Sequence, residues 1–114
     1  MNKRLSRSEV IEIKHKVHDI ISVISDHLKE RGENPSKEER YRAVLDAWNS
    51  TNHFPISRRY LYIEIARGFD FETHETVWRI IESYKTITTG KPDRNSLAGY
   101  YRTWEKILQF TYTD

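Results

Sequence analysis

The sequence predicts an all-α protein of about five helices, with a long N-terminal helix and a helix-turn-helix at roughly residues 57–85. Apolar residues recur at three- and four-residue steps through most of the chain, which is the spacing of one helix face. Serine or threonine precedes several of these segments, and glycine or proline follows them, as is typical of helix ends. The chain has 114 residues, the size of one domain, so we expect a single helical domain over 1–114.

The first expected helix covers residues 7–31. Ser6 with Glu9 three residues later is typical of a capping box, and Gly32 is typical of a helix end. Its apolar seam consists of Val10, Ile13, Val17, Ile20, Ile21, Ile24 and Leu28. A helix of this length measures about 37 Å, more than a compact domain of this size easily covers. We therefore expect that it either breaks or packs its exposed part on another chain, which makes a homodimer through this helix an expected arrangement.

The second expected helix begins after Ser36, with Glu39 completing another capping box, and ends near Asn49. Its apolar face consists of Tyr41, Val44, Leu45 and Trp48. Residues 50–56 contain a proline and several polar residues, so we expect a loop there.

The third expected helix begins with Ser57 as N-cap, runs to about Arg67 and is ended by Gly68. The alternation of apolar residues over 60–65 is also compatible with a strand, which is the alternative for this segment. The fourth expected helix runs from about Thr73 to Lys85.

A polar loop over residues 86–95 and a C-terminal helix at 96–110 complete the expected fold, and the last residues are expected to fray. The three tryptophans Trp48, Trp78 and Trp104 lie on apolar faces at helical spacing. We expect all three to pack in the core rather than to stack on bases.

The third and fourth helices have the features of a helix-turn-helix. Ala66 supplies the small residue that a close crossing of two helices needs, and Gly68 supplies the break after it. Apolar residues of the second helix would set the crossing angle: Val77, Ile80 and Ile81. The first turn of that helix, Thr73–Thr76, is polar throughout, as expected for a helix that contacts base edges.

The segment 64–77 resembles the helix-turn-helix of the C-terminal DNA-binding domain of DnaA, the bacterial replication initiator. The family pattern is Glu-Ile-Gly-Arg-x-Phe-Gly-Gly-Arg-Asp-His-Thr-Thr-Val, and the alignment needs no gap. The matching residues are Glu64, Ile65, Arg67, Phe69, His74, Thr76 and Val77. The resemblance implies that His74 and Thr76 face DNA in the major groove. The sequence differs from the pattern at 70–73 and at Glu75, and it has no phosphate-binding loop of an ATPase.

The expected function is sequence-specific binding of double-stranded DNA, by a small regulator of transcription or a replication accessory, of the kind that phages and mobile elements encode. The residues expected to contact bases are Thr73, His74, Glu75, Thr76 and Arg79. Those expected near phosphates are Arg58, Arg59, Arg67, Lys91 and Arg94. A formal net charge of +2 permits a nucleic-acid partner without requiring one.

An acidic segment keeps a second interpretation open. Residues 70–85 contain four acidic and two basic side chains, a net charge of −2, which weakens attraction to phosphate. The alternative is therefore a small protein-interaction module, or inhibitor, that binds a host protein through the acidic helix at 70–82.

Other classes of function lack their residues in this sequence. There is no cysteine, which excludes disulfides, thiolate nucleophiles and cysteine-bound zinc. His15 and His18 with Asp19 lack further ligands at metal-binding spacing. Asp70, Glu72 and Glu75 are close in sequence, but a nuclease needs carboxylates clustered around Mg²⁺, so we do not expect nuclease chemistry from them. We expect no enzyme activity, no metal, no cofactor and no small-molecule substrate.

The apolar segments are too short or too interrupted to form a signal peptide or to span a bilayer. We therefore expect a cytoplasmic protein without a membrane partner.

Overall fold

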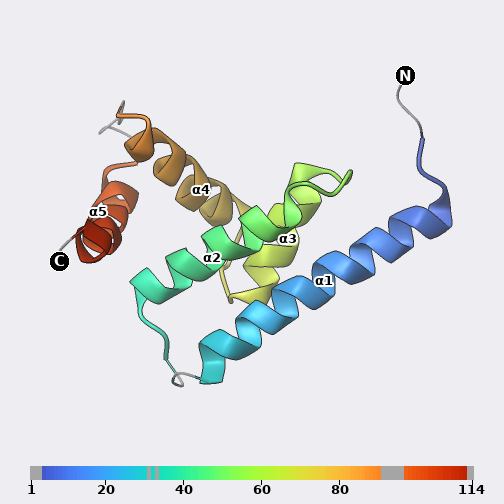
Figure 1. The fold of residues 1–114 in the computed structure, drawn as a ribbon, viewed down its shortest axis with the longest axis horizontal. Helices are drawn as coiled ribbons and strands as arrows, with labels where there is room; N and C mark the ends of the chain where they lie inside the picture. The colour runs from blue at the N-terminus through green and yellow to red at the C-terminus, as the bar shows by residue number, and fades with distance from the viewer. Residues whose placement is uncertain (1–3, 31, 33, 91–96, 113–114) are drawn as a thin grey trace.

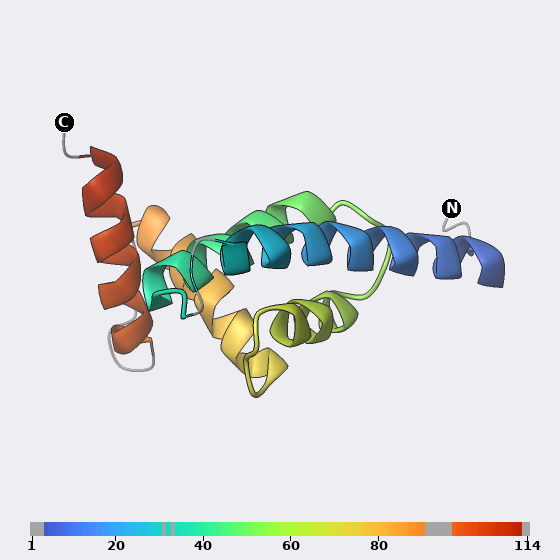
Figure 2. The same cartoon turned by 90° about the horizontal axis from the view of Figure 1, so that it is seen from below.

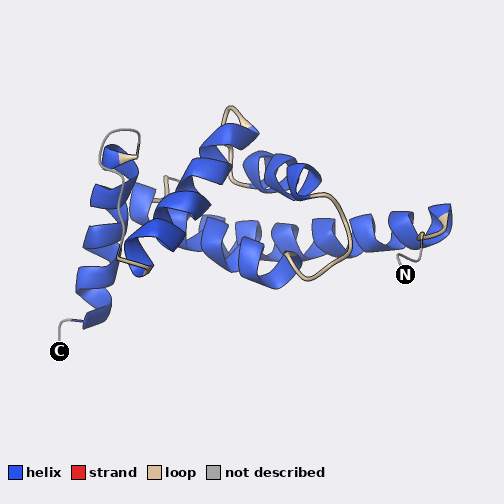
Figure 3. Cartoon of the chain, turned by 90° about the horizontal axis from the view of Figure 1, so that it is seen from above, coloured by secondary structure: helices blue, strands red, loops and turns tan. Residues whose placement is uncertain are grey.

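The computed structural model describes residues 4–30, 32, 34–90 and 97–112, and within these ranges it consists of helices and the turns between them (Figures 1 and 3). The helices are α1 (Arg7–Glu30), α2 (Lys37–Thr51), α3 (Arg58–Gly68), α4 (His74–Thr88) and α5 (Ala98–Tyr112). The described ranges contain no strand, so the alternative strand at 60–65 is wrong and the predicted all-α class is confirmed.

The helix starts follow the serine residues that the sequence analysis selected. The Ser36 hydroxyl accepts from the Glu39 backbone N–H, and the Glu39 carboxylate accepts from the Ser36 N–H, which confirms the capping box. Ser6 and Glu9 exchange the same pair of bonds before α1. Ser57 caps α3 by accepting from the backbone N–H of Tyr60.

Three helices extend beyond their predicted ends. α2 continues to Thr51, whose hydroxyl donates to the Ala47 carbonyl at 2.7 Å, α4 continues to Thr88, and α5, which begins at Ala98, continues to Tyr112. In α4 the Thr86 hydroxyl donates in the same way to the carbonyl of Glu82 at 2.7 Å. A threonine hydroxyl can donate to the backbone carbonyl one turn earlier in the same helix, so threonine does not have to end the helix. The polar composition of these segments therefore does not mark where the helices end.

The core lies where α2 meets all four other helices. Side chains with almost no exposed surface come from every helix: Val17, Ile21, Val44, Ala47, Leu61, Ile65, Val77, Ile80, Ile81, Tyr101 and Trp104. Figure 2 shows α3 and the beginning of α4 on one side of α1 and α2, and α5 across one end of the bundle. This arrangement leaves the turn between α3 and α4 at the surface.

Aromatic contacts attach α5 to the bundle. The Trp104 indole N–H donates to the Ile80 carbonyl at 2.9 Å, and its ring lies 5.5 Å from that of Tyr41 and 4.9 Å from that of Tyr84. Burial raises the pKa of the Tyr41 hydroxyl to about 12, so the group stays neutral in the core. Trp48 is buried as well and stacks on Tyr62 with ring centroids 5.1 Å apart.

The prediction for the third tryptophan is wrong. Trp78 is 43% exposed, whereas Trp48 and Trp104 are 5% and 1% exposed. Position 78 lies on the outer side of α4, three residues after the exposed Glu75, and the buried face of α4 is formed by Val77, Ile80 and Ile81.

α1 is one continuous helix from Arg7 to Glu30, so the predicted alternative of a break does not occur. Its buried residues, Val17, Ile21 and Ser25, lie from the middle of the helix towards its C-terminal end. The N-terminal turns extend beyond the other helices, as Figures 1 and 2 show. Neither α1 nor any other described helix is both long enough and apolar enough to cross a membrane.

Candidate nucleic-acid interface

Residues 69–73 connect α3 to α4 in a tight turn. Asp70 adopts a left-handed conformation, with φ of 58°, and the backbone N–H of Phe71 donates to the Ala66 carbonyl at 2.9 Å. This bond closes the end of α3 in the manner of a Schellman motif. Gly68 is the last residue of α3, as predicted. The chain changes direction at Asp70, the residue with the left-handed backbone conformation.

Gly68 has a different role, which is to let α1 approach. A Cβ atom at this position would lie 2.5 Å from the Cγ2 atom of Ile21 in α1, closer than carbon atoms can pack. The Ser25 hydroxyl of α1 also donates to the Gly68 carbonyl at 2.7 Å. The C-terminal end of α3 is therefore held against α1 by a close contact and a hydrogen bond.

Arg40 of α2 holds the same turn from another side. Its guanidinium group donates to the carbonyls of Phe69 and Asp70, at 3.0 and 3.1 Å, and lies 4.2 Å from the ring centre of Phe71. Charge-assisted hydrogen bonds of this kind are stronger than neutral ones. Arg40 is not among the predicted site residues, because no local pattern in the sequence links it to a turn about thirty residues later.

A cleft lies beside the turn, where α3 and α4 diverge. It is lined by Ile63, Ala66, Arg67, Phe71, Glu72, Thr73, His74 and Glu75. The structure thus brings together four of the predicted DNA-contacting residues, Arg67, Thr73, His74 and Glu75. Thr73 is the N-cap of α4, but its side chain makes no capping hydrogen bond to the helix backbone.

Thr76 faces another surface. It lines a separate hollow with Tyr41 of α2 and Tyr100 of α5. Its hydroxyl lies 3.4 Å from that of Thr73, so it borders the first turn of α4 without sharing the cleft with Glu75.

Several charged side chains of α3 and α4 form ion pairs with residues of the same helix. Arg79 lies 3.6 Å from Glu75 and Lys85 lies 3.7 Å from Glu82, one turn apart on α4. Arg67 lies 3.8 Å from Glu64, which His18 of α1 also approaches, at 3.7 Å. The more exposed pairs on α4 contribute little to stability, whereas the Glu64 side chain is only 15% exposed. All of these pairs reduce the net field that the acidic side chains create.

Arg58 and Arg59 are exposed at the other end of α3 from the turn. Burial raises the pKa of Tyr62, and the charges of Arg58 and Glu82 act on that pKa in opposite directions. Arg59 and Arg67 are eight residues apart on one side of α3, about 12 Å along the axis. The remaining predicted phosphate contacts, Lys91 and Arg94, are outside the described residues.

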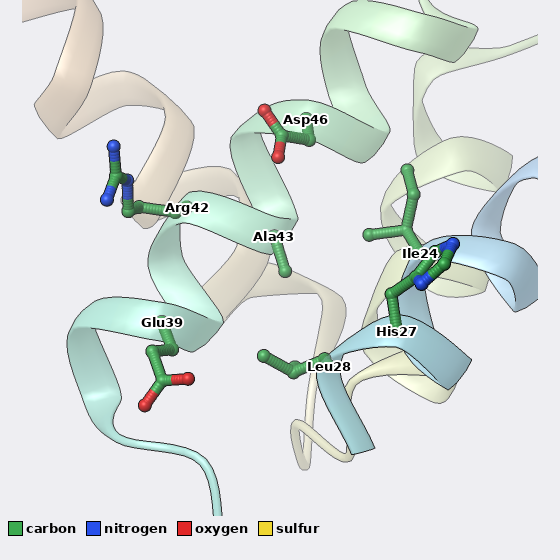
Figure 4. A pocket seen from close by; sticks show the side chains of 7 residues that line it. All are labelled: Ile24, His27, Leu28, Glu39, Arg42, Ala43 and Asp46. Carbon is green, nitrogen blue, oxygen red and sulfur yellow. The ribbon is translucent and has the colours of Figure 1, made fainter. Parts of the chain in front are cut away.

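A further groove separates the end of α1 from α2 (Figure 4). Its lining consists of Ile24, His27, Leu28, Glu39, Arg42, Ala43 and Asp46. Side chains of both charges alternate along it, and none forms a recognised ligand-binding arrangement. Within the described residues, no group of three or more histidine, aspartate or glutamate side chains is arranged to hold a metal ion.

Comparisons with protein-family models, with curated proteins and with solved structures find no match to this chain. The resemblance of residues 64–77 to the DnaA helix-turn-helix therefore stays a prediction from the sequence.

Proposed function

We propose that the protein binds double-stranded DNA in a sequence-specific manner, with α3 and α4 acting as a helix-turn-helix and α4 entering the major groove. The observation that carries this proposal is the turn between them. Ser25 of α1 donates to the carbonyl of Gly68 at the end of α3, and Arg40 of α2 donates to two carbonyls of the turn, so the first turn of α4 is presented at the surface on a firm support. A recognition helix needs such a fixed orientation to place side chains against base edges.

Phosphate contacts would come from α3. Arg59 and Arg67 are exposed on one side of this helix, and their axial separation of about 12 Å is close to the width of the major groove. Arg58 adds a third positive charge at the start of α3, and Lys91 and Arg94 follow α4 in the sequence. Contacts from these residues would supply affinity that does not depend on sequence.

Base contacts would come from the cleft and the outer side of α4. Glu75 can accept a hydrogen bond from a cytosine amino group, and Arg79 can donate to guanine. Thr73 and His74 lie at the start of the helix, where side chains of a recognition helix reach furthest into the groove. Thr76 would contact DNA only at the edge of the interface, because it faces α2 and α5.

The biological setting belongs to the same proposal. A small DNA-binding protein fits a transcription regulator or a replication accessory in the cytoplasm. The extended N-terminal turns of α1 offer a surface for a homodimer, and dimeric helix-turn-helix proteins bind two half-sites.

A protein-interaction module is the second candidate, and the exposed Trp78 favours it. Tryptophan and arginine are the residues most enriched where protein interfaces carry their binding energy. Trp78 lies on α4 beside Arg79, within the acidic segment 70–82. Under this proposal the same helix would bind a host protein with a basic surface.

A salt titration distinguishes the two candidates. We expect DNA binding at low salt that weakens as salt rises, and the double substitution Arg58→Ala/Arg59→Ala should reduce the slope of log affinity against log salt by about 2. Fluorescence polarisation with labelled random and genomic duplexes measures both quantities. The matched control Arg102→Ala/Lys106→Ala removes two exposed charges from α5 and should leave the slope unchanged. Absence of binding at low salt would reject the DNA-binding function in favour of the protein partner.

A further inference from the structure

Three large apolar side chains are exposed among the described residues, namely Ile11, Val23 and Trp78. Ile11 and Val23 are both on α1, but they are twelve residues apart and point about 120° away from each other around the helix. They therefore form no shared patch. Trp78 is different, because it lies within the helix that carries the proposed base contacts.

The charges around Trp78 cancel each other. Glu75 lies one turn before it and is paired with Arg79, and Glu82 lies one turn after it and is paired with Lys85. The indole is therefore the apolar centre of a face whose charges are locally balanced. Such a face is suited to an apolar contact, because neither sign of charge dominates next to the ring.

Positive charge is carried by α3, which packs against α4. Arg58, Arg59 and Arg67 are exposed on α3, and Arg67 lines the same cleft as Glu75, the residue one turn before Trp78. A polyanion that lies against these arginines would bring its own apolar groups to the indole. In duplex DNA the apolar group that the major groove exposes is the C5-methyl group of a pyrimidine.

We propose that Trp78 determines sequence specificity by packing its indole on the C5-methyl group of a pyrimidine in the major groove. This inference rests on the proposed DNA-binding function. Thymine and 5-methylcytosine carry the same methyl group at the same place, so both are candidate ligands for this contact. Trp78 adds discrimination, while Arg58, Arg59 and Arg67 supply affinity for any sequence.

The test begins with duplexes that the wild-type protein selects from a random library. Each selected duplex is then made again with deoxyuridine in place of one thymidine at a time, and separately with 5-methylcytosine in place of one cytosine at a time. Loss of affinity of about fourfold at one uracil position, which is ~0.8 kcal/mol for one buried methyl group, assigns the contact to thymine. A gain of similar size at one methylated position assigns it to 5-methylcytosine.

The variant Trp78→Ala should bind each selected duplex and its base-replaced copy with equal affinity. Trp78→Gln should do the same, with a longer side chain that also favours a helix. Val23→Ala removes an exposed apolar group elsewhere and should discriminate as the wild type does. The wild-type comparison needs no variant, so it holds even if a substitution disturbs folding. Equal wild-type affinity for every paired duplex overturns this inference and leaves DNA binding in place. Failure to bind any duplex at low salt overturns both.

Discussion

The turn between α3 and α4 and the outer face of α4 are neighbours in the chain, but they are built in opposite ways. The turn is held by groups from distant helices, with Ser25 on the Gly68 carbonyl and Arg40 on the two carbonyls that follow. On the outer face of α4 the ion pairs of Glu75 and Glu82 are formed with residues of the same helix, and the contact with another helix is a looser one, of Lys85 with the ring of Trp48 in α2 at 5.6 Å.

The turn and the outer face therefore have different tasks: the turn orients α4, and the outer face would recognise the DNA sequence. A turn fixed by α1 and α2 sets the direction of α4, so changes there should cost stability. Exposed side chains one or two turns later can change without loss of the fold, since surface substitutions usually alter stability by less than about 0.5 kcal/mol. Recognition can therefore vary on an unchanged support.

The largest effect is expected at the contact between α3 and α1. Gly68→Ala places a Cβ atom against the Cγ2 atom of Ile21, which is buried and branched at Cβ and so has little freedom to move away. We expect a loss of about 1–3 kcal/mol in the free energy of unfolding, measured by denaturant titration.

Gly99→Ala is the matched control, because a Cβ atom there meets nothing within 4 Å in the helix α5. It should leave stability unchanged or raise it by up to about 1 kcal/mol, as alanine favours a helix more than glycine does. Equal effects of the two substitutions would mean that the packing of Ile21 against Gly68 does not limit the size of the side chain at that position.

A smaller loss is expected from removing the guanidinium group that holds the turn. Arg40→Met keeps the length of the side chain but deletes its bonds to the carbonyls of Phe69 and Asp70. We expect a loss of about 1 kcal/mol in stability, because both bonds lie near the surface, and weaker DNA binding because the first turn of α4 is less firmly placed. Arg42→Met, an exposed position on the same helix, should change neither quantity in thermal unfolding and polarisation measurements.

Local patterns in the sequence were sufficient for the helices. Serine residues followed by glutamate three positions later placed the starts of α1 and α2, and Ser57 placed the start of α3, because a cap depends on only a few adjacent residues. The ends were harder to predict, since Thr51 and Thr88 continue their helices by bonding to their own backbone. Composition alone does not distinguish such threonines from loop residues.

The candidate site was predicted in outline, and its supports were missed. Residues near the turn are close in sequence, so Arg67, His74 and Glu75 could be grouped from spacing alone. The contacts of Arg40 with the turn, and of Ile21 with the position of Gly68, join residues far apart in the chain. Only the packing of whole helices brings these groups together, and a single sequence does not contain that information in any local pattern.

The smallest effect on stability, and the sharpest test of the comparison, is expected on the outer face of α4. Glu75→Gln removes one charge from an exposed pair, and such pairs contribute at most about 0.5 kcal/mol. Stability should therefore hardly change. DNA affinity should rise several-fold and become more dependent on salt, because Arg79 is released to face phosphate or base.

The selected sequence should change as well. A carboxylate at this position accepts from cytosine, whereas the amide of glutamine pairs with adenine through both of its groups. A selection experiment on the wild type and on Glu75→Gln should therefore show one position that changes from cytosine to adenine, with the other positions kept. If the substitution instead lowers the melting temperature as much as Arg40→Met does, Glu75 belongs to the structure of the turn. The first turn of α4 would then belong to the fixed support, and the residues that contact bases would start at Trp78 and Arg79.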